Sequence, residues 1–160
     1  MNGRAGQQVD RRRGFVLLET LVALAILSFG LLGGLTMLIA GLRASREAMQ
    51  RTAAVTLAAD LAERIRANRS AGIAYDLPSD KEPVAPDSAC SATTPCEATA
   101  RAAQDLYEWR QRVADALPGA ASRVAVQQLA TAAASVVTIE IRWLVPGSPG
   151  ERLVTLRLLA

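Results

Sequence analysis

The first half of the chain separates into two hydrophobic patterns, and the first of them is uniformly apolar. Residues 20–42 hold no charged side chain, and their only polar side chains are the hydroxyls of Thr20, Ser28 and Thr36. At a helical rise of about 1.5 Å per residue this stretch reaches roughly 34 Å, enough to cross a hydrocarbon core of about 30 Å. A core helix of a soluble protein needs a polar face, and this stretch has none. The pattern predicts a membrane-spanning helix.

After Leu42 the pattern becomes amphipathic. Residues 43–69 contain no proline or glycine and are rich in the helix formers alanine, leucine and arginine. Apolar positions recur every four residues, with alanines beside them: Met49, Ala53, Leu57, Leu61 and Ile65, then Ala54, Ala58 and Ala62. Acid-before-base pairs of helical spacing lie on the polar side: Glu47 with Arg51, and Asp60 with Arg64. We expect one helix from about residue 15 to 68, with the stripe of its second half buried under a small domain.

The remainder predicts a second helix and a small sheet. Residues 98–117 place apolar side chains three or four apart, and Pro118 and Gly119 follow as a stop signal. Three strands are expected, at residues 123–129, 137–143 and 152–159. The last two alternate apolar and polar side chains and form an antiparallel hairpin around a turn at residues 146–150.

A proline-containing stretch at residues 70–100 predicts an exposed loop, and it holds the only two cysteines, Cys90 and Cys96. With no histidine in the chain, two cysteines make a poor zinc site. A redox pair more usually has two residues between its cysteines, whereas five lie between these. The membrane topology puts this loop in an oxidising periplasm, so we expect a disulfide that holds a small surface turn.

The distribution of basic side chains predicts a leader peptide at the N-terminus. The chain has 18 basic and 15 acidic side chains, and residues 1–14 include four arginines and one aspartate, so the rest is balanced. The basic excess indicates a positive-inside orientation, and nucleic-acid binding is not expected. A secretory signal would have a shorter apolar run followed by its cleavage site. We expect any cut before the run, at Gly14, where glycine allows an extended backbone between Arg13 and Phe15.

One hexapeptide at this point carries a family resemblance: Gly14-Phe15-Val16-Leu17-Leu18-Glu19. With basic residues before it and a long apolar helix after it, the segment resembles the class III signal of type IV prepilins. The resemblance implies cleavage after Gly14 by a prepilin peptidase and methylation of the new amino terminus on Phe15. It also implies that Glu19 pairs with the Phe15 ammonium of its own or a neighbouring subunit and fixes the register of assembly. The alternative is that Glu19 reaches lipid headgroups and favours the helix dipole.

Two further features bear on this resemblance. Gly30 and Gly34 either let two helices approach closely or allow the helix to bend or melt on assembly. Many major pilins have a proline in this region and this chain has none, so both alternatives stay open. The soluble half resembles the PilV group of minor pilins, also called type IV pilus modification proteins, in its cysteine loop, in residues 105–109 and 116–119, and in a closing strand with Trp143.

Together these features imply an α+β, type IV pilin-like lollipop: a long N-terminal helix packed under a small antiparallel sheet with a second helix. The expected parts are a leader (1–14), a transmembrane half-helix (15–42), an amphipathic half-helix (43–69) and a small periplasmic α+β part with the disulfide loop (70–160). The N-terminus would be cytoplasmic and the C-terminal part periplasmic, in a single-pass inner-membrane protein that later enters the extracellular pilus.

No enzyme activity, cofactor or metal site is expected. The chain has no histidine, no glycine-rich phosphate loop and no nucleophile beside a base, and we interpret Asp105 and Glu108 as a solvated helix face. The predicted function is that of a minor pilin contributing to pilus priming, assembly or modification and to adhesion. Its predicted partners are the prepilin peptidase and other minor and major pilins. The alternatives are a minor pseudopilin of a type II secretion system and a single-pass membrane protein with a periplasmic binding domain.

Overall fold

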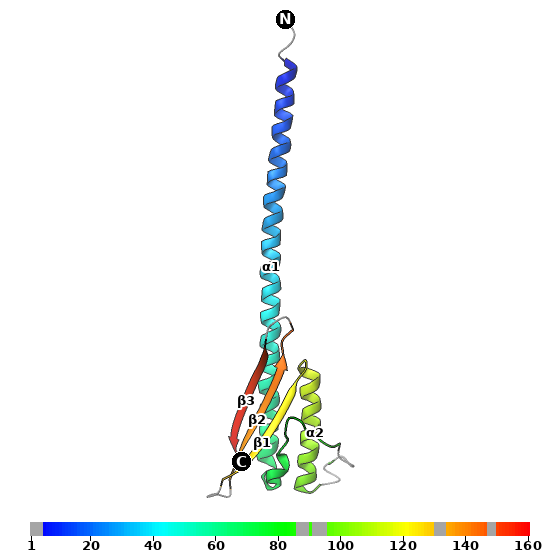
Figure 1. Cartoon of the computed structure of the whole chain (residues 1–160), viewed down its shortest axis with the longest axis vertical. Coiled ribbons are helices and arrows are strands. Elements are labelled where there is room, and N and C mark those ends of the chain that lie inside the picture. Colours follow the sequence, from blue (N-terminus) through cyan, green and yellow to red (C-terminus); the bar gives the residue numbers. More distant parts are fainter. Residues whose placement is uncertain (1–4, 86–89, 91–95, 130–133, 147–149) are drawn as a thin grey trace. The chain divides into compact units, whose positions relative to one another are not determined.

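The computed structural model describes residues 5–85, 90, 96–129, 134–146 and 150–160, with side chains from Phe15 onwards (Figure 1). The chain forms two compact units, Met1–Arg46 and Glu47–Ala160. The elements follow in this order: α1 (Ala5–Ala67), a 3-10 helix η1 (Arg69–Tyr75), α2 (Ala98–Ala116), β1 (Ala121–Gln128), β2 (Ser135–Leu144) and β3 (Glu151–Leu159). The predicted α+β layout of long apolar helix, second helix and antiparallel sheet is confirmed.

In the first unit, α1 begins well before the predicted start at residue 15. Residues 5–14 include three arginines, two glutamines and no proline, so they are compatible with a helix despite two glycines. From Phe15 to Arg46 every side chain is exposed. The hydroxyls of Thr20, Ser28 and Thr36 donate to the carbonyls of Leu17, Leu24 and Gly33 on the same helix, at 2.9, 2.7 and 2.8 Å.

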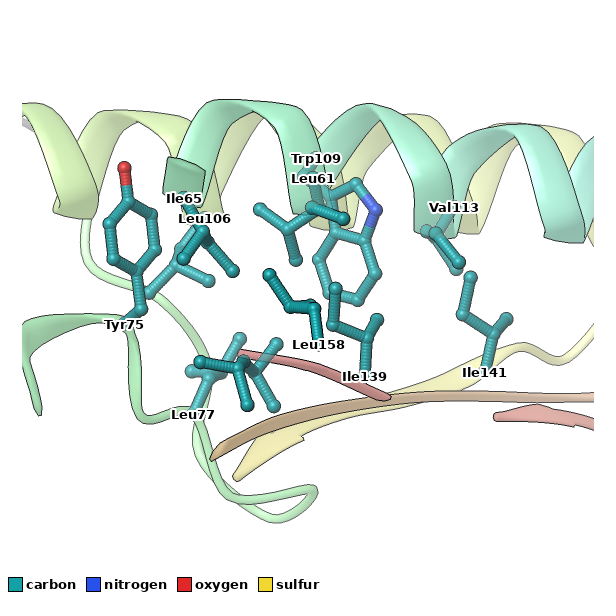
Figure 2. Packing of buried hydrophobic residues seen from close by; sticks show 14 of the residues in the cluster. Leu61, Ile65, Tyr75, Leu77, Leu106, Trp109, Val113, Ile139, Ile141 and Leu158 are labelled. Atoms are coloured by element: carbon teal, nitrogen blue, oxygen red, sulfur yellow. The ribbon is translucent and has the colours of Figure 1, made fainter. Parts of the chain in front are cut away.

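The second unit has two layers. The end of α1 and α2 lie over one face of the sheet, and the buried side chains fill the space between helices and strands (Figure 2). The sheet has the order β1-β2-β3, and both pairs of strands are antiparallel. Within β2, Val137, Ile139, Ile141 and Trp143 are buried, which confirms the predicted alternation. The turn predicted at residues 146–150 lies partly outside the described residues.

The core joins α1 to α2 as well as both helices to the sheet. Leu61, Ile65, Trp109 and Ile139 are all buried, and Figure 2 shows them converging between the two layers. The indole Nε1 of Trp109 donates a hydrogen bond of 2.9 Å to the carbonyl oxygen of Leu57, so α2 is tied to α1 by a polar as well as an apolar contact.

The exposed loop predicted from residue 70 onwards is wrong at its beginning. Ala71, Tyr75 and Leu77 are buried, and Leu77 forms a β-bridge with Val124 of β1. Gly72, with φ of +51°, lies in a conformation that favours glycine and breaks the helical path inside η1. The chain therefore passes through the core before it reaches the proline-containing segment.

The predicted burial of Met49 is also wrong, since its side chain is 68% exposed. Within the stripe, the first buried side chain is that of Ala54. Ala58, Leu61, Ala62 and Ile65 are buried as well. The predicted pair of Glu47 with Arg51 does not form. Oε1 of Glu47 instead accepts a hydrogen bond of 2.6 Å from Nε of Arg152 on β3.

Candidate functional site

The first candidate site is the apolar half of α1. By length and composition, it is the one described helix that could cross a membrane, and its most apolar window has no buried residue. Gly14, Phe15 and Glu19 all lie within the helix. Phe15 and Glu19 are four residues apart and therefore share one helix face, one turn from each other. Both are exposed, and within the part of the chain whose side chains are described Glu19 forms no ion pair.

The glycines of this half-helix have open space around them. A Cβ added at Gly30 or Gly34 would meet no described atom within 4 Å, so the backbone there is open to close approach. Both residues lie within the continuous helix α1.

The second candidate site is a polar cluster formed by Asp60, Arg64, Tyr75, Asp105 and Glu108. Arg64 lies at its centre. Its Nη1 donates to Asp105 Oδ1 and to Glu108 Oε2, both at 3.0 Å, and its Nε donates to Asp60 Oδ2 at 3.1 Å. One guanidinium thus binds three carboxylates, of which Asp105 and Glu108 connect α1 to α2 and Asp60 lies on α1 itself. Charge-assisted bonds of this kind are the stronger hydrogen bonds in proteins.

Tyr75 brings η1 into the same cluster. Its hydroxyl donates a 2.7 Å hydrogen bond to Asp105 Oδ2, and Nδ2 of the buried Asn68 donates to the Tyr75 oxygen at 3.2 Å. The same amide nitrogen donates to the carbonyl oxygen of Ala98 at 2.8 Å, at the start of α2. The end of α1, η1 and α2 are therefore held by one connected set of hydrogen bonds.

The cluster continues to the cysteine loop. Cys90 and Cys96 form the expected disulfide. The backbone N–H of Cys90 donates to Gln104 Oε1 at 2.6 Å, and Gln104 Nε2 donates to Glu108 Oε1 at 2.8 Å. The disulfide loop is thus connected to α1 through Gln104, Glu108 and Arg64.

Three pKa values reflect this arrangement. Partial burial would lower the pKa of Arg64, but hydrogen bonds to Glu108 and Asp105 and the charge of Asp60 outweigh burial and raise it. Burial, reinforced by the hydrogen bond to Asp105, raises the pKa of the Tyr75 hydroxyl. Hydrogen bonds from Gln104 and Arg64 lower the pKa of Glu108. Each shift stabilises the protonation state at neutral pH, so the cluster is suited to holding elements together.

The interpretation of Asp105 and Glu108 as a solvated face is wrong for Asp105. This residue is only 8% exposed, because Arg64 and Tyr75 cover its carboxylate. Tyr75 and Asn68 were missed altogether, since no local pattern marks residues that meet through contacts 30 positions apart. Among the described residues, no group of three or more His, Cys, Asp or Glu side chains is placed to hold a metal ion.

Comparison with known families adds one finding. Residues 36–107 match the family model of the type IV pilin Tt1218 (Tt1218-like). The match covers less than half of the 160 residues and includes the second half of α1, the disulfide loop and part of α2. It supports a type IV pilin-like protein with a structural role and with other pilins as partners. No curated protein and no solved structure matches the chain.

Proposed function

We propose that this chain is a minor pilin of a type IV pilus, similar to the PilV group, that contributes to priming, assembly or modification of the filament and to adhesion. The observation that carries the proposal is the contrast between Glu19 and its surroundings. An apolar half-helix with every described side chain exposed keeps a single carboxylate, one turn after Phe15. Such a surface needs an apolar environment, which the inner membrane supplies first and neighbouring pilin helices supply later.

The position of the carboxylate suggests its role. Cleavage after Gly14 would create an ammonium on Phe15, and methylation would keep it cationic. A charge buried in an apolar bundle needs a partner, and the Glu19 carboxylate of the same or a neighbouring subunit is the natural one. Within one chain, Glu19 lies one helical turn from that terminus. Pairing of the two groups would set the axial register between subunits. The match of residues 36–107 to the pilin family model supports a pilin role in general; it includes the end of the apolar half-helix but not Phe15 or Glu19.

Purification of sheared pili and mass spectrometry of their subunits tests the proposal. The chain should be present without residues 1–14 and with a methylated Phe15. Gly14→Val should keep the leader, because a bulky β-branched residue replaces the small one at the cleavage position. Processing of Gly14→Val at the normal position would contradict the assigned site. A mature protein with an intact N-terminus and no presence in pili would contradict the pilin role.

Substitution at Glu19 tests the register separately. Glu19→Ala should still insert and be cleaved, but it should accumulate in the inner membrane, because loss of one partner of a buried ion pair costs about 3–5 kcal/mol. Glu19→Gln should give intermediate incorporation, since it keeps a hydrogen-bond acceptor without the charge. The two variants and the wild type are compared in pilus and membrane fractions at equal expression. Equal incorporation of all three would remove Glu19 from the assembly mechanism.

A further inference from the structure

The sheet of the second unit has one face covered by helices and one face that carries exposed side chains. The side chains that point towards the helices are buried, such as Val124 on β1, Ile139 and Ile141 on β2 and Leu158 on β3. Because side chains alternate between the two faces of a strand, the residues between these positions point to the other face. We call this other face the open face of the sheet.

Arginines from all three strands lie on the open face. The strand register pairs Arg123 of β1 with Glu140 of β2, and Glu140 with Thr155 of β3. Arg142 lies two residues beyond Glu140 and Arg157 two residues beyond Thr155, so both share this face. Three cations are thus placed around one carboxylate.

Most of this charge has no counter-charge in the described part of the chain. Glu140 approaches Arg142 at 3.9 Å, and the other two arginines form no ion pair there. Leu153 and Leu159, on the same face, are 56% and 67% exposed. The open face therefore offers unneutralised cations beside exposed leucines.

The chain also carries a surface of the opposite character at residues 80–84, which we call the acidic segment. Asp80 and Glu82 are both exposed, and Lys81 lies between them. Val84, at 77%, is the most exposed large apolar side chain among the described residues of the second unit. The acidic segment thus combines two anions, one cation and one apolar side chain.

This segment is held in place without losing its charge. Nη1 of Arg110 donates to the Lys81 carbonyl oxygen at 2.6 Å. The same nitrogen lies 3.5 Å from Glu82 Oε1, yet the Glu82 side chain remains 87% exposed. Within the described residues Asp80 forms no ion pair. Both carboxylates are therefore available to another molecule.

The wider distribution of charge has the same polarity. Residues 47–120, which form the helices and the acidic segment, contain 11 acidic and 8 basic side chains. Residues 121–160, which form the sheet, contain 2 acidic and 4 basic side chains. Two copies therefore attract when the open face of one meets the helix and loop residues of the other, and complementary charge of this kind steers association.

We propose that the open face of one copy binds the acidic segment of a second copy. The unneutralised arginines bind the two carboxylates, Lys81 lies close to Glu140, and Val84 packs against the exposed leucines. Because two different surfaces meet, the contact is heterologous, and its repetition builds a ring or an open array of copies. The inference goes beyond the pilin proposal and does not depend on it, since it concerns the second unit and that proposal concerns the apolar half of α1.

A uniform polyanion fits the open face less well. Its central carboxylate, Glu140, repels a nucleic acid or a phosphorylated polysaccharide, whereas the acidic segment brings a cation as well as two anions. Stacking of bases needs an aromatic side chain, and the one aromatic residue of the three strands, Trp143, is buried. Charges of both signs beside an apolar side chain are what a protein segment supplies, and residues 80–84 supply them on the same chain.

The first test is cross-linking between two cysteine variants of the full chain in detergent micelles. Thr155→Cys marks the open face and Ser79→Cys marks the acidic segment, and both positions are exposed. A short bis-maleimide should cross-link a mixture of the two variants, and each variant alone should give roughly tenfold less product. The control is Thr99→Cys, exposed on α2, which should not cross-link to Thr155→Cys. No product in the mixture, or equal product from one variant alone or from the control, would overturn the proposal.

The second test exchanges the charges between the two surfaces. Arg123→Glu with Arg157→Glu, in the chain that carries the open-face cysteine, should lower the yield of cross-linked product roughly tenfold or more. Asp80→Lys with Glu82→Lys in the other chain should restore the yield. Restoration by a change in the second chain separates loss of the contact from loss of folding in the first. Failure to restore the product would overturn the proposal.

A matched control addresses net charge. Arg51→Glu with Arg69→Glu makes the same change of charge at two exposed arginines outside the open face. The yield of cross-linked product should stay unchanged, because neither residue belongs to the contact. A loss as large as that of the open-face variant would mean that overall charge, and not the open face, decides the association.

Photo-cross-linking in cells that express the chain tests the choice of partner. Thr155→benzoylphenylalanine should give an adduct with the acidic segment of another copy, identified by mass spectrometry of the digested product. An adduct formed only with a different protein or with nucleic acid would assign the open face to that partner and overturn the proposal.

Discussion

The two halves of α1 are built from the same kind of helix but differ in where their packing partners lie. In the first unit, every described side chain from Phe15 to Arg46 is exposed, although most are apolar. In the second unit, Leu61 and Ile65 are buried by residues of α2 and of the sheet. A helix sequence alone therefore does not decide burial. The second half is covered by its own domain, whereas no described residue covers the first half.

The largest expected difference between the halves comes from matched leucine truncations. Leu61→Ala should lower the free energy of unfolding of the second unit by about 2–5 kcal/mol, because it removes a fully buried side chain and leaves a cavity. Leu24→Ala, in the first unit, should change it by less than about 0.5 kcal/mol. Denaturant titration of the full chain in micelles, followed by near-ultraviolet circular dichroism of Trp109 and Trp143, measures both. Similar losses would mean that the halves are not independent.

The next largest effect concerns the polar cluster around Arg64, which connects only the second half of α1 to other elements. Asp105→Asn keeps the shape of the side chain but removes the charge that Arg64 and Tyr75 bind, so stability should fall by about 1–3 kcal/mol. The control is Glu63→Gln, since Glu63 also pairs with an arginine, Arg66, but on an exposed helix surface. That change should cost less than about 1 kcal/mol. Equal costs in the same denaturant titration would show that burial of the cluster contributes nothing.

A smaller effect is expected from pH. The pKa of Glu108 is lowered from 4.5 in the folded protein, so the unfolded chain takes up this proton first as pH falls. The stabilisation is fully present above pH 4.5 and is lost as pH falls through the folded-state pKa. Because the side chain is 45% exposed, the contribution should stay below about 1 kcal/mol. The difference in stability between wild type and Glu108→Gln, measured across this range, should shrink towards low pH, and a constant difference would contradict the assignment.

The smallest expected effect is that of truncating Met49, which lies on α1 between its exposed part and its buried part. Met49→Ala should leave the stability of the second unit within about 0.5 kcal/mol of the wild type, because the side chain is exposed. A buried methionine at the same position would cost about 2–5 kcal/mol on truncation. A loss of that size in thermal or denaturant unfolding would show that the covering domain extends at least one turn further along α1.

Local periodicity was sufficient for α2 and β2, but not for η1 or for the contacts between elements. The bounds of α2 and the inward residues of β2 follow from spacing alone, because one helix face or one strand face is buried along its whole length. Met49 shares the helical spacing of Leu61, but the layer that covers α1 ends before it, and no local pattern encodes that length. Asp105 is buried by Arg64, which lies 41 residues earlier in the chain. Such contacts depend on how the elements meet, so a single sequence does not display them.

Thr20, Ser28 and Thr36 bind the backbone of their own helix, and this affects how another helix could pack against the first unit. Each hydroxyl proton is already donated to a carbonyl of its own helix. A neighbouring apolar helix would therefore find no hydroxyl donor at these three positions, so they would not fix its rotation or its axial position. In the proposed filament the carboxylate of Glu19 would supply that preference, since only one rotation and one translation bring an opposite charge to it. A single carboxylate would thus carry orientational information that the three hydroxyls do not.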